Sequence, residues 1–242
     1  MRLAAAVLAA GFLLVSVAAA RPEARPTVYA ASSLTNVFPK IAPAKYSFAG
    51  SDALAAQIRQ GAPADVFASA NMALPQGLHD DQLCSKPVVF TRNALVVIVP
   101  TSNPAGIHSV YDLTRQGLKV VVAAPSVPVG HYTRKVLVKL HLQAVLDNVV
   151  SEETDVREVL AKIALGEGDA GFVYRTDART APDKVKPIEI PARGQPDVRY
   201  GICVVAASSH KTAALAFVSK VLGPRGQRIL RHNGFLPRTS KR

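Results

Sequence analysis

Residues 27–36 read Thr-Val-Tyr-Ala-Ala-Ser-Ser-Leu-Thr-Asn, a β-branched and apolar run that leads directly into small and hydroxyl-bearing residues. The run Thr27–Ala31 predicts a buried strand, and the Ser-rich stretch after it is typical of the start of a helix. The same order, a short apolar run and then an amphipathic stretch, recurs to the end of the chain. This alternation favours a parallel, doubly wound α/β fold.

Short apolar or β-branched runs predict the strands, and they are Thr27–Ala31, Tyr46–Phe48, Ala64–Ser69, Ala94–Val99, Lys119–Ala123, Gly171–Val173, Val185–Ile190 and Ile202–Ala206. Amphipathic stretches predict the helices, and they are Asp52–Arg59, Val110–Gln116, Gly130–His141, Asp155–Leu165, Lys211–Leu222 and Arg225–Arg231. Asp155 is a candidate N-cap, with Glu158 three residues later in the capping-box pattern.

The predicted junctions between a strand and the following helix are rich in residues that cap helices. Four of them, at residues 29–36, 48–54, 124–131 and 151–157, hold no Lys or Arg before the helix begins, except Arg157 at the edge. The first N–H groups of a helix lack partners and lie at its positive end, so they bind an anion without a cationic side chain. One such junction is explained by capping alone, but four together favour a small-oxyanion site.

The composition is that of a globular protein with an excess of positive charge. The 242 residues include 29 Lys and Arg against 17 Asp and Glu, for a net charge of +12, and 49% of them are hydrophobic. This excludes a disordered chain and suggests an anionic partner: nucleic acid, a membrane surface or a small anion. Scattered basic residues and an aromatic content of 6% argue against nucleic acid.

The N-terminus predicts a secretory signal peptide over residues 1–20. Met1-Arg2 precedes an apolar run from Leu3 to Val17, and Ala18-Ala19-Ala20 provides a cleavage site. A retained membrane anchor is the alternative, because the run nearly reaches spanning length. Without Arg2, 28 basic residues against 17 acidic ones leave a charge of +11. We therefore expect a periplasmic or otherwise extracytoplasmic protein, with no Cys near the cleavage site to suggest a lipid anchor.

The two cysteines, Cys84 and Cys203, are too few for a cysteine-based zinc cluster. Export permits a disulfide between them, but two buried free thiols are the interpretation that we prefer. The six histidines show no metal-ligand spacing, although His131 lies beside the third junction and could contact an anion.

The sequence offers no clear catalytic motif. Gly166-Glu-Gly-Asp-Ala-Gly171 matches the glycine pattern of dinucleotide-binding proteins, but it follows a predicted helix and precedes a strand, the reverse of the required order. We interpret it as a helix-to-strand turn. No nucleophile elbow, phosphate-binding loop or zinc-protease motif is present. We expect a protein that is not an enzyme, with a secreted hydrolase as the alternative.

Several segments together resemble the periplasmic molybdate-binding proteins of ABC transporters. The matching motifs are Val28-Tyr-Ala-Ala-Ser-Ser-Leu-Thr-Asn36, Phe48-Ala-Gly-Ser-Asp-Ala-Leu-Ala-Ala-Gln-Ile58, Gly61-Ala-Pro-Ala-Asp-Val-Phe67, Asn93-Ala-Leu-Val-Val97, Asp155-Val-Arg157 and Gly171-Phe-Val-Tyr-Arg-Thr-Asp177. The closing segments Gly223-Pro-Arg-Gly226 and Gly234-Phe235 also fit. The resemblance covers residues 27–236, and its six motifs occur in the family's order.

The resemblance implies a two-lobe fold of the type II periplasmic-binding-protein kind, with two doubly wound lobes joined by two crossover strands. The crossings would lie near Val88–Pro100 and Arg199–Ala206. Lobe I would then comprise residues 21–91 plus 203–242, and lobe II residues 92–202. The ligand would be clamped in a cleft between the lobes of a monomer.

The resemblance also implies the ligand and its donors. Ser33 and Ser51 would donate hydroxyl and backbone N–H groups from lobe I. Val129 and Val156 would donate backbone N–H groups from lobe II, and Tyr174 its phenol. The ligand would be molybdate or tungstate, with sulfate or phosphate as alternatives. The molybdenum would be held only as its oxyanion, with no direct metal ligand and no cofactor. The partner would be the membrane permease of the transporter, not nucleic acid.

Two residues depart from the family pattern. Asp52 follows Ser51 where a small or hydroxyl residue is common, and a carboxylate there would repel a dianion unless it points outward. Val129 stands where Ala is usual, so a larger side chain would narrow the mouth of the cleft. Both bear on selectivity, although neither removes a donor.

Overall fold

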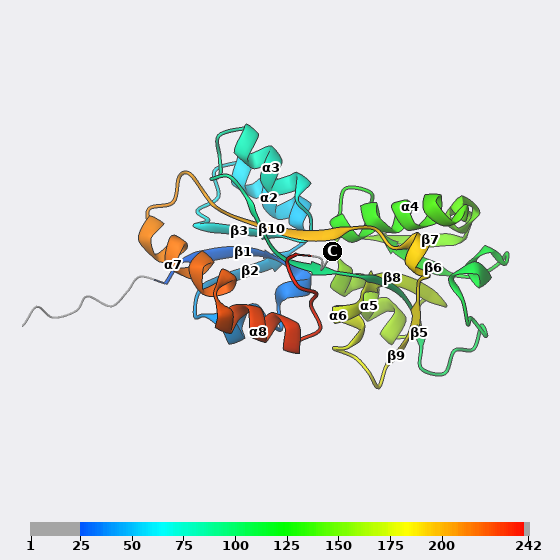
Figure 1. Cartoon of the computed structure of the whole chain (residues 1–242). Helices are drawn as coiled ribbons and strands as arrows, with labels where there is room; N and C mark the ends of the chain where they lie inside the picture. Colours follow the sequence, from blue (N-terminus) through cyan, green and yellow to red (C-terminus); the bar gives the residue numbers. More distant parts are fainter. Residues whose placement is uncertain (1–24, 240–242) are drawn as a thin grey trace, which may run out of the picture.

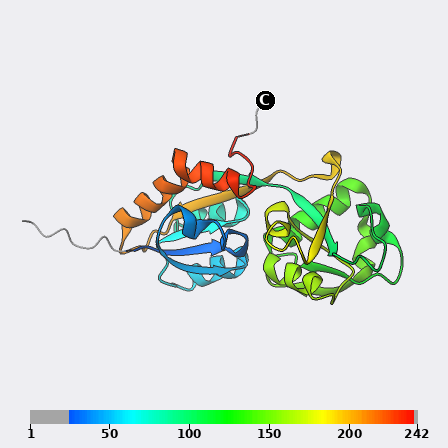
Figure 2. The ribbon, with the colours of Figure 1, turned by 90° about the horizontal axis from the view of Figure 1, so that it is seen from below.

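The structure of the protein is a computed structural model that describes residues 25–239 (Figure 1). The predicted signal peptide, residues 1–20, lies outside the described residues. Between residues 25 and 239, no helix is long and apolar enough to cross a membrane. The described chain forms two halves, each built on its own sheet (Figures 1 and 2).

The first half is built on a five-stranded sheet of order β2-β1-β3-β10-β4. Its strands are β1 (Thr27–Ala31), β2 (Lys45–Ala49), β3 (Val66–Ser69), β4 (Val88–Asn93) and β10 (Val198–Val204). β1 runs parallel to β2 and β3, whereas β10 is antiparallel to both β3 and β4. β10 reaches this sheet from the other half of the molecule, so it enters in the opposite direction.

The second half repeats this plan in a sheet of order β7-β6-β8-β5-β9. Its strands are β5 (Leu95–Pro100), β6 (Val120–Ala123), β7 (Val149–Glu153), β8 (Ala170–Tyr174) and β9 (Val185–Glu189). β6 is parallel to β7 and β8, and β5 is antiparallel to β8 and β9. The expected α/β class is confirmed, but both sheets are mixed rather than purely parallel.

Helices cover both faces of each sheet (Figure 1). The α-helices of the first half are α1 (Phe38–Ile41), α2 (Ser51–Arg59), α3 (Ala73–Asp80), α7 (Lys211–Leu222) and α8 (Pro224–His232), and those of the second are α4 (Pro128–Leu140), α5 (Val156–Ala164) and α6 (Arg175–Ala178). Short 3-10 helices are η1 (Ser32–Leu34), η2 (Val110–Thr114), η3 (Gln143–Asn148) and η4 (Ala192–Gly194). Both faces of each sheet can therefore be apolar, as the continuous runs in the sequence require.

Two chain passages connect the halves (Figure 2). The first runs from β4 into β5 through Ala94, within the expected crossing at 88–100. The second lies between the end of β9 and the start of β10, at residues 190–197, upstream of the expected Arg199–Ala206. Residues 198–202, which the expected boundaries assign to lobe II, pair with β3 and β4 of the first sheet.

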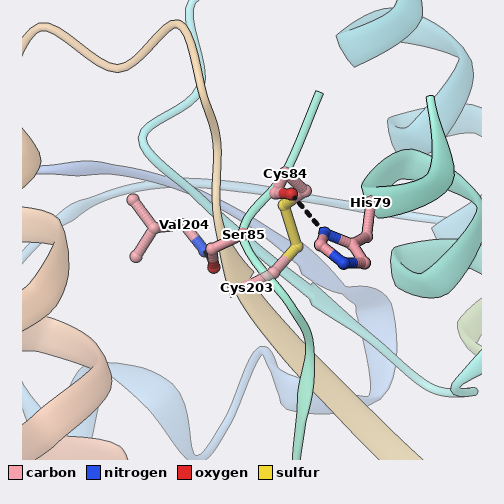
Figure 3. Close-up of a disulfide and its surroundings, with 5 residues drawn as sticks. All are labelled: His79, Cys84, Ser85, Cys203 and Val204. Atoms are coloured by element: carbon pink, nitrogen blue, oxygen red, sulfur yellow. Dashed lines mark hydrogen bonds between the residues drawn. A yellow bond between two sulfur atoms is a disulfide. The ribbon is translucent and has the colours of Figure 1, made fainter. Parts of the chain in front are cut away.

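Cys84 and Cys203 form a disulfide, so the preference for free thiols is wrong (Figure 3). Cys203 lies on β10. The backbone of Cys84 forms an isolated antiparallel β-bridge with Val205, just beyond that strand. The pair belongs to a small apolar cluster in the first half. Sequence spacing could not reveal this pairing, because 119 positions separate the cysteines and only the strand order brings them together.

Candidate functional site

The five residues predicted to bind the ligand line one small cavity where the two halves meet. They are Ser33, Ser51, Val129, Val156 and Tyr174. The rest of the lining is Ala31, Ser32, Ala49, Gly50, Ala70, Val127, Pro128 and Asp155, so it contains no Lys or Arg. The cavity has about the room of one water molecule. The halves therefore lie close together around the cavity.

The first half contributes hydroxyl groups. Ser33 lies in η1 directly after β1, and Ser51 is the first residue of α2 after β2. Both are buried. Ser51 Oγ accepts a hydrogen bond from the backbone N–H of Ala70 at 3.1 Å, which leaves the hydroxyl proton free to donate into the cavity. Both hydroxyls follow strands at the carboxyl edge of the sheet, where ligands of α/β folds bind.

The second half contributes backbone N–H groups at two helix starts. Pro128 is the first residue of α4 and has no N–H, so Val129 supplies the first such donor of that helix. Val156 is the first residue of α5, and its predicted cap Asp155 accepts from the N–H groups of Arg157 and Glu158 instead. The geometry of helix starts thus leaves the Val129 and Val156 N–H groups available to a ligand.

Tyr174 at the end of β8 supplies a phenol. Its side chain is 1% exposed, and its hydroxyl has no hydrogen-bond partner among the described residues. Burial raises the pKa of Tyr174 well above its ordinary value, so the hydroxyl stays protonated and acts as a donor. A buried hydroxyl without a partner is costly unless a ligand satisfies it.

A buried ion pair lies behind the α5 side of the cavity. Arg157 Nε is 2.9 Å from Oδ1 of Asp177, whose side chain is fully buried in α6. Burial raises the pKa of Asp177 to about 7, although the Arg157 guanidinium acts to lower it. The positive charge of Arg157 is therefore engaged by a carboxylate rather than placed in the cavity lining.

The two departures from the family pattern lie at the junction of the halves. Oδ2 of Asp52 accepts a hydrogen bond of 2.7 Å from the Ser126 hydroxyl of the second half. Asp52 is absent from the cavity lining, whereas Val129 is buried and belongs to it. Nearby, Gly50 approaches so closely that an added Cβ would lie 2.4 Å from the carbonyl oxygen of Thr154. Only glycine allows this approach of the halves.

The remaining sequence candidates lie elsewhere. His131 lines a separate surface groove with Arg134 and Lys135, and burial with these two cations lowers its pKa. Gly166 and Gly168 lie between α5 and β8, and Gly171 lies within β8, in the expected helix-to-strand order. The part of the chain that the structure describes contains no cluster of three or more His, Cys, Asp or Glu that could hold a metal ion.

Two residues that were not among the predicted donors contact the site from β4 and β10, the strands at the first-half ends of the two passages, although Asn93 opens one of the family motifs. The Tyr200 hydroxyl on β10 lies 3.0 Å from Ser33 Oγ, and Asn93 at the end of β4 contacts the Tyr200 hydroxyl at 3.3 Å. No local pattern could reveal that Asn93 and Tyr200 contact each other, because 107 positions separate them.

Comparison with known proteins gives consistent matches. The model of the family of bacterial extracellular solute-binding proteins matches residues 26–236. The molybdate-binding protein ModA of Mycobacterium tuberculosis strain H37Rv is 40% identical over 222 residues, which span 86% of this chain and 83% of the relative.

Two solved structures share the fold. The periplasmic molybdate-binding protein of Azotobacter vinelandii matches with a TM-score of 0.77 at 21% identity, over 88% of this chain and 99% of that one. The sulfate-binding protein SubI of Mycobacterium tuberculosis matches with a TM-score of 0.75 at 19% identity, over 88% and 87%. Such low identities show the fold alone, and proteins named for different oxyanions share it.

Proposed function

The chain belongs to the family of bacterial extracellular solute-binding proteins, and we propose that it captures molybdate, and also tungstate, for delivery to the permease of an ABC transporter. The observation that carries this proposal is the cavity. Five predicted donors from separate segments of both halves meet in it, and its lining holds no cation. The relative named for molybdate binding supports the choice of anion.

The ligand would be held by hydrogen bonds alone. Ser33 and Ser51 donate hydroxyls, Val129 and Val156 donate backbone N–H groups, and Tyr174 donates its phenol. Each hydrogen bond to a charged group contributes about 1.5–3 kcal/mol. Several such bonds would offset the cost of ordering the ion and closing the halves, and a total near −8 to −12 kcal/mol gives roughly micromolar to nanomolar binding.

A site composed of donors also selects by protonation. A fully deprotonated tetrahedral dianion accepts from every donor, whereas phosphate brings an O–H group that finds no acceptor. Sulfate is equally deprotonated, so it is the stronger competitor and is rejected by its smaller size. The size of the cavity around the bound anion must therefore decide between molybdate and sulfate.

The finer features of the proposal follow from the sequence. We propose that residues 1–20 direct export and that the exported protein is a periplasmic monomer. We also propose lobes of residues 21–91 plus 203–242 and of residues 92–202, with residues 198–202 moved to the first lobe because they pair with β3 and β4. The ion would bridge donors of both lobes as they close by a hinge motion at the two passages. The partners would be the anion and the permease, without nucleic acid.

The alternative class is a secreted hydrolase, and we propose a binding role instead because the family is one of solute-binding proteins. The net charge of +11 on the exported protein, from 28 basic and 17 acidic residues, would act as a long-range field that raises the encounter rate with the anion. Binding should therefore slow as ionic strength rises, while the preference among anions persists.

Calorimetric titration of the exported protein with molybdate, tungstate, sulfate and phosphate tests this function. We expect tight binding of molybdate and tungstate, much weaker binding of sulfate and the weakest binding of phosphate. No heat with molybdate, or equal affinity for sulfate, would refute the molybdate assignment. A positive hydrolase assay with the same preparation would restore the enzyme alternative.

A further inference from the structure

We infer that Asn93 and Tyr200 form a hydrogen-bond relay that fixes the Ser33 hydroxyl as a donor toward the bound anion. This inference deepens the proposed function and rests on it. Asn93 and Tyr200 are positioning residues, since neither lines the cavity. The relay joins β4 and β10, the strands that adjoin the two chain passages, to the ligand site.

The relay begins at Asn93, whose amide orientation is set by its neighbours. The backbone N–H of Ala94 donates to Asn93 Oδ1 at 2.9 Å, so the oxygen of the amide faces that N–H group. The amide nitrogen, Nδ2, then donates to Thr176 Oγ1 at 2.9 Å and to the Tyr200 hydroxyl at 3.3 Å. Both hydrogens of the amide are therefore assigned.

The next member is Tyr200 on β10. Thr91 lies opposite Tyr200 in the pairing of β4 with β10, so Asn93 lies diagonally across on the same face of the sheet. The Tyr200 side chain is fully buried. Its oxygen accepts from Asn93, and the hydroxyl proton needs an acceptor of its own. Either oxygen can donate in the 3.0 Å contact between the Tyr200 hydroxyl and Ser33 Oγ, and we assign the Tyr200 proton to this contact, with Ser33 Oγ as the acceptor.

The relay ends at Ser33. Because Ser33 Oγ accepts the hydrogen bond from the Tyr200 hydroxyl, the hydroxyl hydrogen of Ser33 is free to point into the cavity that Ser33 lines. Without Tyr200, the hydroxyl could rotate and present a lone pair, which would repel an anion. The relay thus keeps the Ser33 hydroxyl oriented as a donor. The linked hydrogen bonds also polarise one another, which strengthens the bond from Ser33 to the anion.

The fixed donor orientation of the Ser33 hydroxyl affects which anions the site prefers. A Ser33 hydroxyl held as a donor matches an oxygen that carries no proton, whereas a freely rotating hydroxyl also accepts from a protonated anion. Tyr200 should therefore contribute both to molybdate affinity and to the preference for molybdate over phosphate.

The test is a double-mutant cycle of Tyr200→Phe and Ser33→Ala, measured by molybdate titration of the whole protein. Tyr200→Phe keeps the ring that packs edge-to-face on Tyr174 and Phe90, so we expect it to fold. We expect its Kd to rise roughly tenfold, the size of a lost net hydrogen bond, and its preference over inorganic phosphate to narrow. In the Ser33→Ala background, Tyr200→Phe should change the Kd less than twofold.

The matched control is Tyr46→Phe, which removes a phenol that donates to backbone carbonyls of Phe38 and Ala42, away from the cavity. It should leave the Kd unchanged. If Tyr200→Phe fails to fold, Asn93→Ala replaces it in the same cycle, and its effect should likewise vanish in the Ser33→Ala background.

The outcomes separate the two proposals. A wild-type protein that binds none of the four anions would refute both the proposed function and the relay. Binding by the wild type with an unchanged Kd in Tyr200→Phe, an unchanged preference over phosphate, or equal effects of Tyr200→Phe with and without Ser33 would overturn the relay alone.

Discussion

The two halves of the molecule share a sheet plan but differ in how they present donors and in how they are held together. The first half offers the side-chain hydroxyls of Ser33 and Ser51 and is cross-linked by the Cys84–Cys203 disulfide. The second half offers mainly backbone N–H groups at the starts of α4 and α5, and it buries the Arg157–Asp177 ion pair.

This difference implies different sensitivity to substitution. A hydroxyl donor is lost when its side chain is truncated, whereas a backbone N–H group survives most changes of side chain. The second half therefore depends on helix starts, which Pro128 and the Asp155 cap define, rather than on the identity of the valines. The stability that the disulfide provides depends on reductant, whereas the stability that the ion pair provides depends on pH.

The largest expected effect is on binding in the first half. The Ser33→Ala/Ser51→Ala double variant removes two donors to a dianion, at about 1.5–3 kcal/mol each, so we expect the affinity for molybdate to fall at least about a hundredfold. Calorimetric titration measures this, and circular dichroism confirms that the variant is folded.

The matched control in the second half is Val129→Ala/Val156→Ala. It keeps both N–H groups, so its affinity should change only a fewfold even if stability declines. Equal losses of affinity in the two double variants would show that side-chain packing, not the type of donor, determines binding.

The second effect is on the stability of the first half. Replacing both Cys84 and Cys203 by Ala opens a loop of 119 positions, and we expect the free energy of unfolding to fall by about 2–5 kcal/mol. Urea unfolding with and without a reductant measures the loss. The disulfide is outside the cavity lining, so molybdate affinity of the folded variant should be unchanged. A folded variant that no longer binds would contradict this separation of roles.

The third effect belongs to the second half and depends on pH. Because burial raises the folded pKa of Asp177 to about 7 from an ordinary 3.8, the folded protein binds more protons than the unfolded chain between about pH 4 and 7. The contribution of this group to stability therefore falls as pH rises through that window, by up to about 1.4 kcal/mol per pH unit.

Urea unfolding at several pH values should show this decline in the wild type and a flatter profile in Asp177→Asn. Asp147→Asn, at an exposed position, is the matched control and should keep the wild-type profile. An Asp177→Asn profile as steep as that of the wild type would assign the pH dependence to other groups.

The smallest effect is at the contact between the halves. Ser126→Ala removes the exposed hydrogen bond to Asp52, so we expect about a twofold loss of molybdate affinity, or about 0.5 kcal/mol. Competition titration against the wild type measures such a small change. The control is Ser209→Ala, at an exposed position of the first half, which should leave the molybdate affinity unchanged. An equal loss of affinity in both variants would show that the Ser126–Asp52 hydrogen bond does not stabilise the closed halves.

Much of the fold follows from local patterns. The helix at Lys211–Leu222 begins and ends as expected, and the strand Thr27–Ala31 agrees as well. The helix α3 is not among the predicted helices, and its sequence contains Pro75 and Gly77, two poor helix formers. Pro75 lies in the first turn, where its missing N–H costs no hydrogen bond. The strands β4 and β7 were also missed, because each mixes apolar with polar or charged residues.

Capping residues after strands marked the four junctions that contain Ser33, Ser51, Val129 and Val156, whereas the choice of these residues and of Tyr174 as donors came from the resemblance to the molybdate-binding family. Their meeting in one cavity, the reversed direction of β10, the disulfide and the contacts of Asn93 and Tyr200 depend on strand order. Strand order is set by pairing between distant segments, which no local pattern encodes. The sequence by itself determined the alternation of strands and helices and the small neutral residues at their junctions. Only the tertiary structure decided which junctions face one another, because burial of both sheet faces and the two passages between halves fix that arrangement.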